Sequence, residues 1–291
     1  MSTAATGRLQ PLDVPTGSVR TVAGAGGMPI ATHEYGDPQG RTVLFIHGFC
    51  QSHLCWHEQY TDPALAGLRM VALDLRGHGD SGRAVPEGGA AYAPSDYAED
   101  VKAVIDELAL RDPVLVGWSY GGLVIADYVR TFGTAGISGA VFAGAACRLN
   151  PPAHEDTFIG PGFLENGADL LSGELEAFIR GTVNFLNACI REPLPPERFA
   201  WHLAYNMIVP AANRFALLGR GPERFDEEVL PSFDKPALVI HGRDDQVVLV
   251  GAAGAIAGAI KRSELRVYEN CGHAPFYEQP AAFNRDLLAF L

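Results

Sequence analysis

The chain has 291 residues, of which 47% are hydrophobic and 19% are charged. These proportions are typical of a soluble globular protein with a large core, and the length suits one α/β domain that carries one insertion. The formal net charge is −12, from 22 basic and 34 acidic residues. The chain therefore lacks the basic surface that binding to nucleic acid or to an anionic membrane requires.

The five cysteines indicate reduced thiols rather than a disulfide framework or a metal site. Their number is odd, no two form a C-x-x-C pair, and no His/Cys cluster has the spacing of metal ligands. The first residues show no basic region followed by an apolar run, and no stretch approaches the roughly 18 apolar residues of a membrane span. We expect a cytoplasmic protein without a metal or cofactor. The sequence leaves the oligomeric state undecided.

Short apolar runs recur along the chain after an expected N-terminal arm at residues 1–18. Most of the runs are rich in β-branched residues and do not alternate with polar residues, which is typical of strands buried on both faces of a parallel sheet. The strands that we predict cover residues 19–22, 30–35, 43–46, 70–73, 114–116, 141–142, 237–240 and 265–268.

Helical patterns separate the later strands. Ser95 is a candidate N-cap for a helix over residues 96–110, and a second helix is predicted over 120–132, ending at Gly133. Two further helices are predicted at 252–261 and 280–291. Strands that alternate with helices predict an α/β fold with a doubly wound, mostly parallel sheet.

The alternation breaks between about residues 148 and 231. This stretch is rich in aromatic residues and contains helical segments, such as 175–186 and 199–207, but no clear strand. We predict an inserted helical cap at 148–231, over the carboxyl edge of the sheet, where such folds bind ligands. The core then comprises residues 19–147 and 232–291. The aromatic residues suit an apolar pocket and equally suit the core of a small lid.

A G-x-S-x-G pattern at residues 117–121 indicates that Ser119 is a nucleophile. The pattern alone is weak, but here it directly follows a predicted strand and precedes a predicted helix, as a nucleophile elbow requires. The sharp turn needs neighbours without side chains, which Gly117 and Gly121 provide. The alternative is a glycine-rich turn whose serine merely caps the helix.

His273 and an aspartate follow Ser119 in the order that a Ser-Asp-His triad on this kind of scaffold requires. His273 lies in a loop after the last predicted strand, where it could take the serine proton and return it to the leaving group. Asp244 and Asp245 both follow the strand at 237–240, and the residues alone leave the choice between them open.

Taken together, the motifs resemble the α/β-hydrolase family along nearly the whole chain after the N-terminal arm. The matching segments are His47-Gly48-Phe49, residues 74–81, residues 117–122, residues 241–245 and Gly272-His273. The resemblance implies an α/β-hydrolase fold and favours Asp245, three residues after Gly242, as the acid of the triad. Asp244 then has a local turn or loop contact.

The resemblance also implies an oxyanion hole formed by the backbone N–H groups of Phe49 and Tyr120. The side chains of Phe49 and Trp118 are expected to form walls of the substrate pocket, with Cys50 beside them. Core packing is an alternative role for these side chains, and the two roles are compatible. No metal or organic cofactor is implied.

Within the family, the sequence is similar to bacterial esterases and to cofactor-free haloperoxidases or perhydrolases. Epoxide hydrolases and haloalkane dehalogenases use an aspartate nucleophile, so Ser119 predicts acyl transfer instead. We expect a carboxylic ester hydrolase for small-molecule esters with apolar, short to medium acyl groups. The alternatives are perhydrolase or haloperoxidase activity, hydrolysis of C–C, lactone or amide bonds, and ligand sensing on a hydrolase scaffold.

Residues 77–82 also satisfy the G-x-G-x-x-G pattern of dinucleotide-binding proteins. That site needs a helix to begin at the third glycine, because the phosphate rests on the N–H groups of the helix N-terminus. A loop rich in glycine and proline follows here instead, so we expect no nucleotide site.

Overall fold

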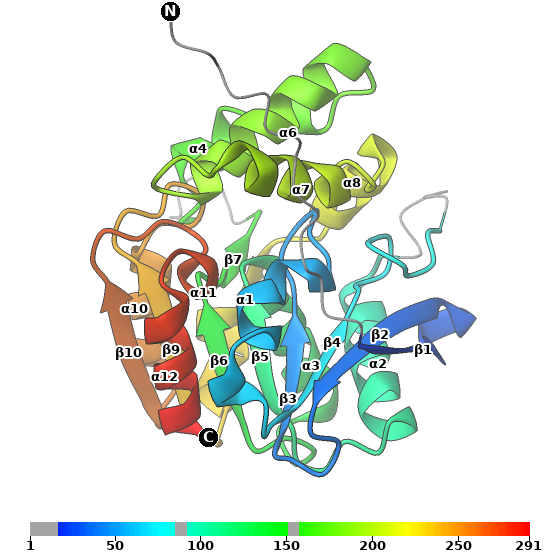
Figure 1. Cartoon of the computed structure of the whole chain (residues 1–291), viewed down its shortest axis with the longest axis vertical. Helices are drawn as coiled ribbons and strands as arrows, with labels where there is room; N and C mark the ends of the chain where they lie inside the picture. The colour runs from blue at the N-terminus through cyan, green and yellow to red at the C-terminus, as the bar shows by residue number, and fades with distance from the viewer. Residues whose placement is uncertain (1–16, 85–91, 151–156) are drawn as a thin grey trace, which may run out of the picture.

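The computed structural model describes residues 17–84, 92–150 and 157–291, and its centre is an eight-stranded sheet in the order β1-β2-β4-β3-β5-β6-β9-β10 (Figure 1). The strands are β1 (Ser18–Ala23), β2 (Pro29–Gly36), β3 (Thr42–Ile46), β4 (Arg69–Leu73), β5 (Val114–Trp118), β6 (Gly139–Ala143), β9 (Ala237–Gly242) and β10 (Ser263–Tyr268). The strands from β4 to β10 in this order are parallel, and β1 and β2 form an antiparallel edge. Each predicted strand is present.

The central strands are buried on both faces, as their unbroken apolar runs predicted. Every residue of β3, β5, β6 and β9 is buried. In β3, Leu44 and Ile46 join the apolar cluster on one face, and Val43 and Phe45 join the cluster on the other. Because successive side chains of a strand point to opposite faces, one continuous apolar run serves both clusters.

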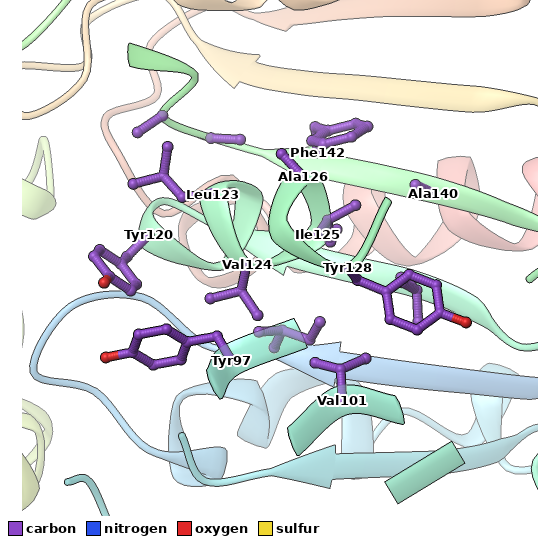
Figure 2. Packing of buried hydrophobic residues seen from close by; sticks show 14 of the residues in the cluster. Tyr97, Val101, Tyr120, Leu123, Val124, Ile125, Ala126, Tyr128, Ala140 and Phe142 are labelled. Carbon is purple, nitrogen blue, oxygen red and sulfur yellow. The ribbon is translucent and has the colours of Figure 1, made fainter. Parts of the chain in front are cut away.

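Helices cover both faces of the sheet. The helices α2 (Pro94–Glu107), α3 (Tyr120–Phe132) and α10 (Gly251–Ala259) pack on one face, and α1 (His57–Tyr60), α11 (Pro275–Glu278) and α12 (Pro280–Phe290) on the other. Short 3₁₀ turns cover Ala25–Gly27, His53–Trp56, Pro63–Leu65 and Leu230–Ser232. Figure 2 shows α2 against α3, where the rings of Tyr97 and Tyr120 lie 5.8 Å apart.

The N-cap predicted for α2 is wrong. The helix begins at Pro94, one residue before Ser95, and Ala93 is the N-cap. Proline suits the first helical position because its fixed φ is already helical and its missing N–H needs no acceptor there. The side chain of Asp96 then reaches back and accepts a hydrogen bond from the N–H of Ala93 at 3.0 Å.

A group of helices lies beyond the carboxyl ends of the parallel strands (Figure 1). They are α4 (Pro161–Leu164), α5 (Gly167–Leu170), α6 (Leu175–Cys189), α7 (Pro196–Asn206) and α8 (Ala211–Leu218). The short strands β7 (Arg148–Leu149) and β8 (Glu223–Arg224) pair in antiparallel fashion beneath them and precede α9 (Phe225–Glu228). The helices expected at 175–186 and 199–207 are present, whereas the pair of short strands was not predicted. The domain boundaries at 148 and 231 stay a prediction.

A buried ion cluster joins α3 to the segment after α8. The side chain of Arg220 is fully buried and donates hydrogen bonds to Asp127 at 2.6 Å and to Glu223 at 3.0 Å. It also donates to the hydroxyl of Tyr120 at 3.3 Å. Burial and the charge of Glu223 raise the pKa of Asp127 to about 7, although Arg220 opposes the change. The guanidinium of Arg220 therefore pairs with two buried carboxyl groups, those of Asp127 and Glu223.

No helix within the described ranges is both long enough and apolar enough to cross a membrane.

Candidate active site

Ser119 occupies the sharp turn between β5 and α3. Its φ of 55° and ψ of −115° lie in a region that non-glycine residues rarely adopt, at a cost of about 1–3 kcal/mol. Backbone hydrogen bonds hold the turn in place. The N–H of Ser119 donates to the carbonyl of Ala143 at 3.1 Å, and its carbonyl accepts from the N–H groups of Gly122 and Ala146. The strain at Ser119 is therefore sustained by contacts to the end of β6 and the loop that follows it.

The glycines around Ser119 are required by close approach of the backbone. A Cβ atom at Gly117 would lie 2.6 Å from the carbonyl oxygen of Gly121, and one at Gly121 would overlap the carbonyl oxygen of Ile46. A Cβ atom at Gly122 would lie 2.6 Å from that of Ala145. The start of α3 therefore packs directly on the ends of β3 and β6.

Asp245 and His273 form a buried hydrogen-bonded pair at the ends of neighbouring strands. His273 Nδ1 lies 2.7 Å from Asp245 Oδ2. The other carboxylate oxygen, Oδ1, accepts from the N–H groups of Val247 and Val248 at 2.8 and 2.9 Å. His241, in β9, places Nε2 at 3.0 Å from Asp245 Oδ2. Both oxygens of the carboxylate are thus fixed.

These contacts keep Asp245 ionised. Burial alone would raise the pKa of the carboxyl group, but the charge of His273 and hydrogen bonds from His241 and His273 outweigh burial. The net result is a pKa well below the usual range for aspartate. A buried anion at this position can hold the imidazole of His273 in one orientation.

Asp244 lies in a different environment. Its side chain is 43% exposed and forms an ion pair with Arg191 at 2.9 Å. Of the two adjacent aspartates that follow β9, the structure therefore brings Asp245 to His273 and leaves Asp244 at the surface.

The backbone of His273 lies beside the turn that carries Ser119. Its carbonyl accepts a hydrogen bond from Trp118 Nε1 at 2.8 Å, and Trp118 directly precedes Ser119. A Cβ atom at Gly144 would lie 2.6 Å from the same carbonyl oxygen, and Gly144 follows the residue that binds the Ser119 N–H. The second ring nitrogen of His273, Nε2, is buried and has no hydrogen-bond partner among the described residues. It is free to exchange a proton with a group in the site.

The loop after β3 approaches Ser119 from the other side. A Cβ atom at Gly48 would lie 3.1 Å from Ser119 Cβ. Phe49 and Tyr120 both border the same cavity as Ser119. Because Tyr120 is the first residue of α3, its N–H has no acceptor within the helix. The structure thus brings together the two residues whose N–H groups were predicted as oxyanion donors.

Two neutral histidines hold this loop. His47 Nε2 accepts from the N–H of Leu75 at 3.0 Å, and His78 Nε2 accepts from the N–H of Cys50 at 3.2 Å. Burial lowers the pKa of His47 to about 4 and that of His78 to about 3. Both rings therefore stay uncharged at neutral pH and keep an acceptor nitrogen for the backbone.

The cavity beside Ser119 is apolar. Most of its lining side chains are aliphatic or aromatic: Phe49, Leu123, Ala146, Leu149, Ile159, Phe163, Phe185, Leu218, Val247 and Val248. Phe163 comes from α4 and Phe185 from α6, and each packs edge-to-face against Phe49. The helices beyond the sheet thus supply one wall of the cavity.

Of the three residues predicted for the substrate pocket, Phe49 lines the cavity that contains Ser119. Trp118 lines a second cavity together with Gln51, His202 and Phe276. Cys50 is fully buried and lines neither cavity. Burial raises the pKa of its thiol to about 12, so it is protonated at neutral pH.

His33, His53, Asp74 and Asp80 place candidate metal-ligating atoms within 4.8 Å of one another. The rings of His33 and His53, however, are stacked 3.3 Å apart with an angle of 11° between them. An ion lies in the plane of each imidazole that ligates it, and two parallel rings in a stack cannot both meet that condition. Asp74 instead accepts hydrogen bonds from His53 and from the N–H of Asp80. The cluster has the geometry of a structural hydrogen-bond network.

A family model described as the alpha/beta hydrolase fold matches residues 41–280. The non-heme chloroperoxidase CPO-A1 of Kitasatospora aureofaciens is 34% identical over 269 residues, which cover 87% of this chain and 93% of that relative. The bifunctional esterase/perhydrolase DCH of Acinetobacter calcoaceticus is 28% identical, over 91% of this chain and 96% of the relative. Among solved structures, the esterase RhEst1 from Rhodococcus sp. ECU1013 has a TM-score of 0.85 and 32% identity, covering 94% of this chain and 98% of that structure.

The chain therefore belongs to the α/β-hydrolase family. It is a hydrolase of this fold, in the group that contains esterases and non-haem haloperoxidases, as the sequence motifs indicated.

Sequence reasoning missed the groups that support Asp245. His241 precedes Asp245 by four residues, at the end of a buried strand, and this position was the available signal. The N–H groups of Val247 and Val248 could also have been anticipated, because an aspartate often accepts from backbone N–H groups two or three residues ahead in a turn.

The contrast between Asp245 and Asp244 gives a direct test. We expect Asp245→Asn to lower kcat for ester hydrolysis on the order of 10³–10⁴-fold, because an amide cannot stabilise the protonated imidazole. Asp244→Asn, at an exposed ion pair, is the matched control and should stay within a fewfold of the unmodified protein. Steady-state kinetics on a chromogenic ester measures both. Equal losses in the two variants would contradict the assignment of Asp245.

Proposed function

We propose that this protein is a serine hydrolase that cleaves carboxylic esters, with Ser119, His273 and Asp245 as its catalytic triad. The observation that carries the proposal is the strained Ser119 at the β5–α3 turn, beside a His273 that is anchored to the buried Asp245. The esterases among its relatives and structural neighbours support the same reaction.

The first half of the proposed reaction is acylation of Ser119. The hydroxyl of Ser119 attacks the ester carbonyl and its proton passes to His273 Nε2. The N–H groups of Phe49 and Tyr120 stabilise the oxyanion that forms. His273 then gives the proton to the departing alcohol, and the acyl group stays on Ser119.

The second half is deacylation by water. Water gives a proton to His273 Nε2 while it attacks the acyl-enzyme, and the same two N–H groups stabilise the second oxyanion. The carboxylic acid leaves when Ser119 regains its proton. Asp245 stays ionised throughout and stabilises the protonated imidazole in both halves.

The apolar cavity beside Ser119 favours an apolar acyl group. Among the residues that line it, Ser119 and Tyr120 are the two with a polar side-chain group. A short to medium hydrocarbon chain can bury its surface there, whereas a charged chain would lose its hydration without a partner. The substrate is therefore a small ester, and a cytoplasmic location without a macromolecular partner stays a prediction from the sequence.

Covalent labelling tests Ser119 itself. A fluorophosphonate probe should label the protein at one site, and Ser119→Ala should abolish both labelling and hydrolysis of p-nitrophenyl esters. Ser172→Ala, in the loop before α6, is the matched control and should behave as the unmodified protein. Labelling that persists in Ser119→Ala would sink the proposal, and a protein that neither labels nor turns over would favour the ligand-sensor alternative.

The size of the acyl pocket gives a second test. Phe163→Ala should raise kcat/KM for longer acyl chains relative to acetate, because it removes a ring from the cavity wall. A panel of p-nitrophenyl esters from acetate to decanoate measures this ratio. Phe215→Ala, at a side chain 66% exposed on α8, is the control and should leave the ratio unchanged. An unchanged ratio in Phe163→Ala would place the acyl chain elsewhere.

A second candidate activity uses hydrogen peroxide as the acyl acceptor. It is favoured by the relatives, which include a non-heme chloroperoxidase and a bifunctional esterase/perhydrolase matched over most of their lengths. Peroxide would attack the same acyl-enzyme and release a peracid in place of the acid. With one ester, peracid formation at millimolar peroxide should then compete with hydrolysis. Formation of acid alone over that range would exclude perhydrolysis. Lactones, amides and C–C substrates belong in the same panel.

A further inference from the structure

The carboxylate of Glu278, in α11, binds the backbone on both sides of His273. Its Oε1 accepts from the N–H of Gly272 at 2.9 Å and from that of Ala274 at 3.3 Å. Its Oε2 accepts from the N–H of Arg191 at 2.8 Å, in the segment after α6. One side chain therefore binds the N–H groups of the residues before and after His273 and joins them to a distant part of the chain.

The histidine loop and the end of α6 are joined a second time. The N–H of His273 donates to the carbonyl of Cys189, the last residue of α6, at 2.9 Å. One turn earlier in the same helix, Phe185 borders the cavity that contains Ser119. The helix that contacts the bound acyl chain in the proposed reaction is thus also the helix that holds the loop of the proposed base.

Gly272 shows how closely these segments meet. A Cβ atom there would lie 3.0 Å from the N–H nitrogen of Arg191 and 3.0 Å from Glu278 Oε1. A side chain at this position would push the loop away from α6. The contact between the His273 loop and the end of α6 therefore requires a residue without a side chain at position 272, in addition to the hydrogen bonds.

We propose that Glu278 is a positioning residue that clamps the His273 loop to the end of α6 and supplies a second negative charge beside the proposed base. The inference rests on the proposed function, in which His273 takes and returns protons. It assigns Glu278 two effects that can be separated: its oxygens hold the backbone, and its charge favours the protonated imidazole.

The charge of His273 in turn acts on the pKa of Glu278. Burial raises the pKa of Glu278, while the N–H groups that it binds and the positive charge of His273 oppose the rise. Coupling between two sites is reciprocal, so an ionised Glu278 favours protonation of His273.

Other charged or titratable groups also surround His273. They are Asp245 and Asp244 after β9, His241 in β9, Arg191 after α6, and the thiols of Cys189 and Cys271. Arg191 and Asp244 pair with each other, and burial raises the pKa of both thiols, which keeps them neutral. The carboxylates that act on His273 are therefore chiefly Asp245 and Glu278.

The test compares Glu278→Gln and Glu278→Ala with the control Glu269→Gln. Glu269 precedes the same loop, but its side chain is 66% exposed and pairs with Arg243. Glutamine keeps an acceptor oxygen for Gly272 and Ala274 and removes the charge, whereas alanine removes both. We measure kcat, KM and the pH profile of kcat/KM with a p-nitrophenyl ester.

We expect Glu278→Ala to lower kcat by about tenfold or more with little change in KM, because the base is displaced while the pocket is intact. Glu278→Gln should recover part of this loss. In both variants the acid limb of the profile should move to lower pH, because protonation of His273 has lost a stabilising carboxylate. A purely structural role would reduce the rate without moving the limb.

A measurement without turnover separates this inference from the proposed function. Proton NMR follows the His273 ring, assigned by its absence in His273→Gln, through a pH titration of each protein. The midpoint should fall in Glu278→Gln and stay unchanged in Glu269→Gln, whether or not Ser119 is the nucleophile. If Glu278→Ala does not fold, the titration midpoint and kcat of Glu278→Gln test the proposal on their own. An unmoved midpoint and a control-like kcat in Glu278→Gln would overturn the proposal.

Discussion

The turn between β5 and α3 is the constraint on which the site depends. It holds Ser119 at a positive φ and packs the start of α3 against the ends of β3 and β6 without room for a Cβ atom at Gly121. The close packing of α3 on the ends of these strands fixes the distance from Ser119 to the loops that leave the neighbouring strands. The loop after β3 and the loop after β10 that contains His273 leave the same edge of the sheet, because parallel strands end at a common edge. Both therefore reach Ser119 through short connections.

The core of the fold could be predicted from the sequence, and so could the candidacy of Ser119 and His273 for the proposed triad. Unbroken apolar runs indicated buried parallel strands, and the pattern around Ser119 has a physical meaning that depends on its strand and helix. The choice of Asp245 over Asp244 was different, because adjacent residues in a turn can point either way. It followed from a family resemblance, and the structure supplies the reason: two backbone N–H groups and His241 surround the carboxylate of Asp245.

Side-chain direction explains why Trp118 and Phe49 line different cavities in the structure. Trp118 directly precedes Ser119, but as a strand residue it points to the face that carries Phe276, whereas Phe49 and Tyr120 belong to the cluster on the other face. The two residues that the sequence suggested as walls of one pocket therefore belong to different apolar clusters. The helices α4 and α5 and the pair β7–β8 are too short for any periodicity to reveal. Glu278 was not identified from the sequence, because its hydrogen-bond partners are backbone N–H groups and no sequence motif reveals such contacts.

The ion cluster of Arg220 has a consequence for the order in which the protein can fold. Asp127 lies on the central helix α3, and the guanidinium that binds it is 93 residues further along the chain. During synthesis, α3 emerges from the ribosome long before Arg220 does. Until then, docking α3 onto the sheet would bury a carboxyl group without its partner, which is costly. The packing of α3 therefore depends on a residue that is made after the helices above the sheet.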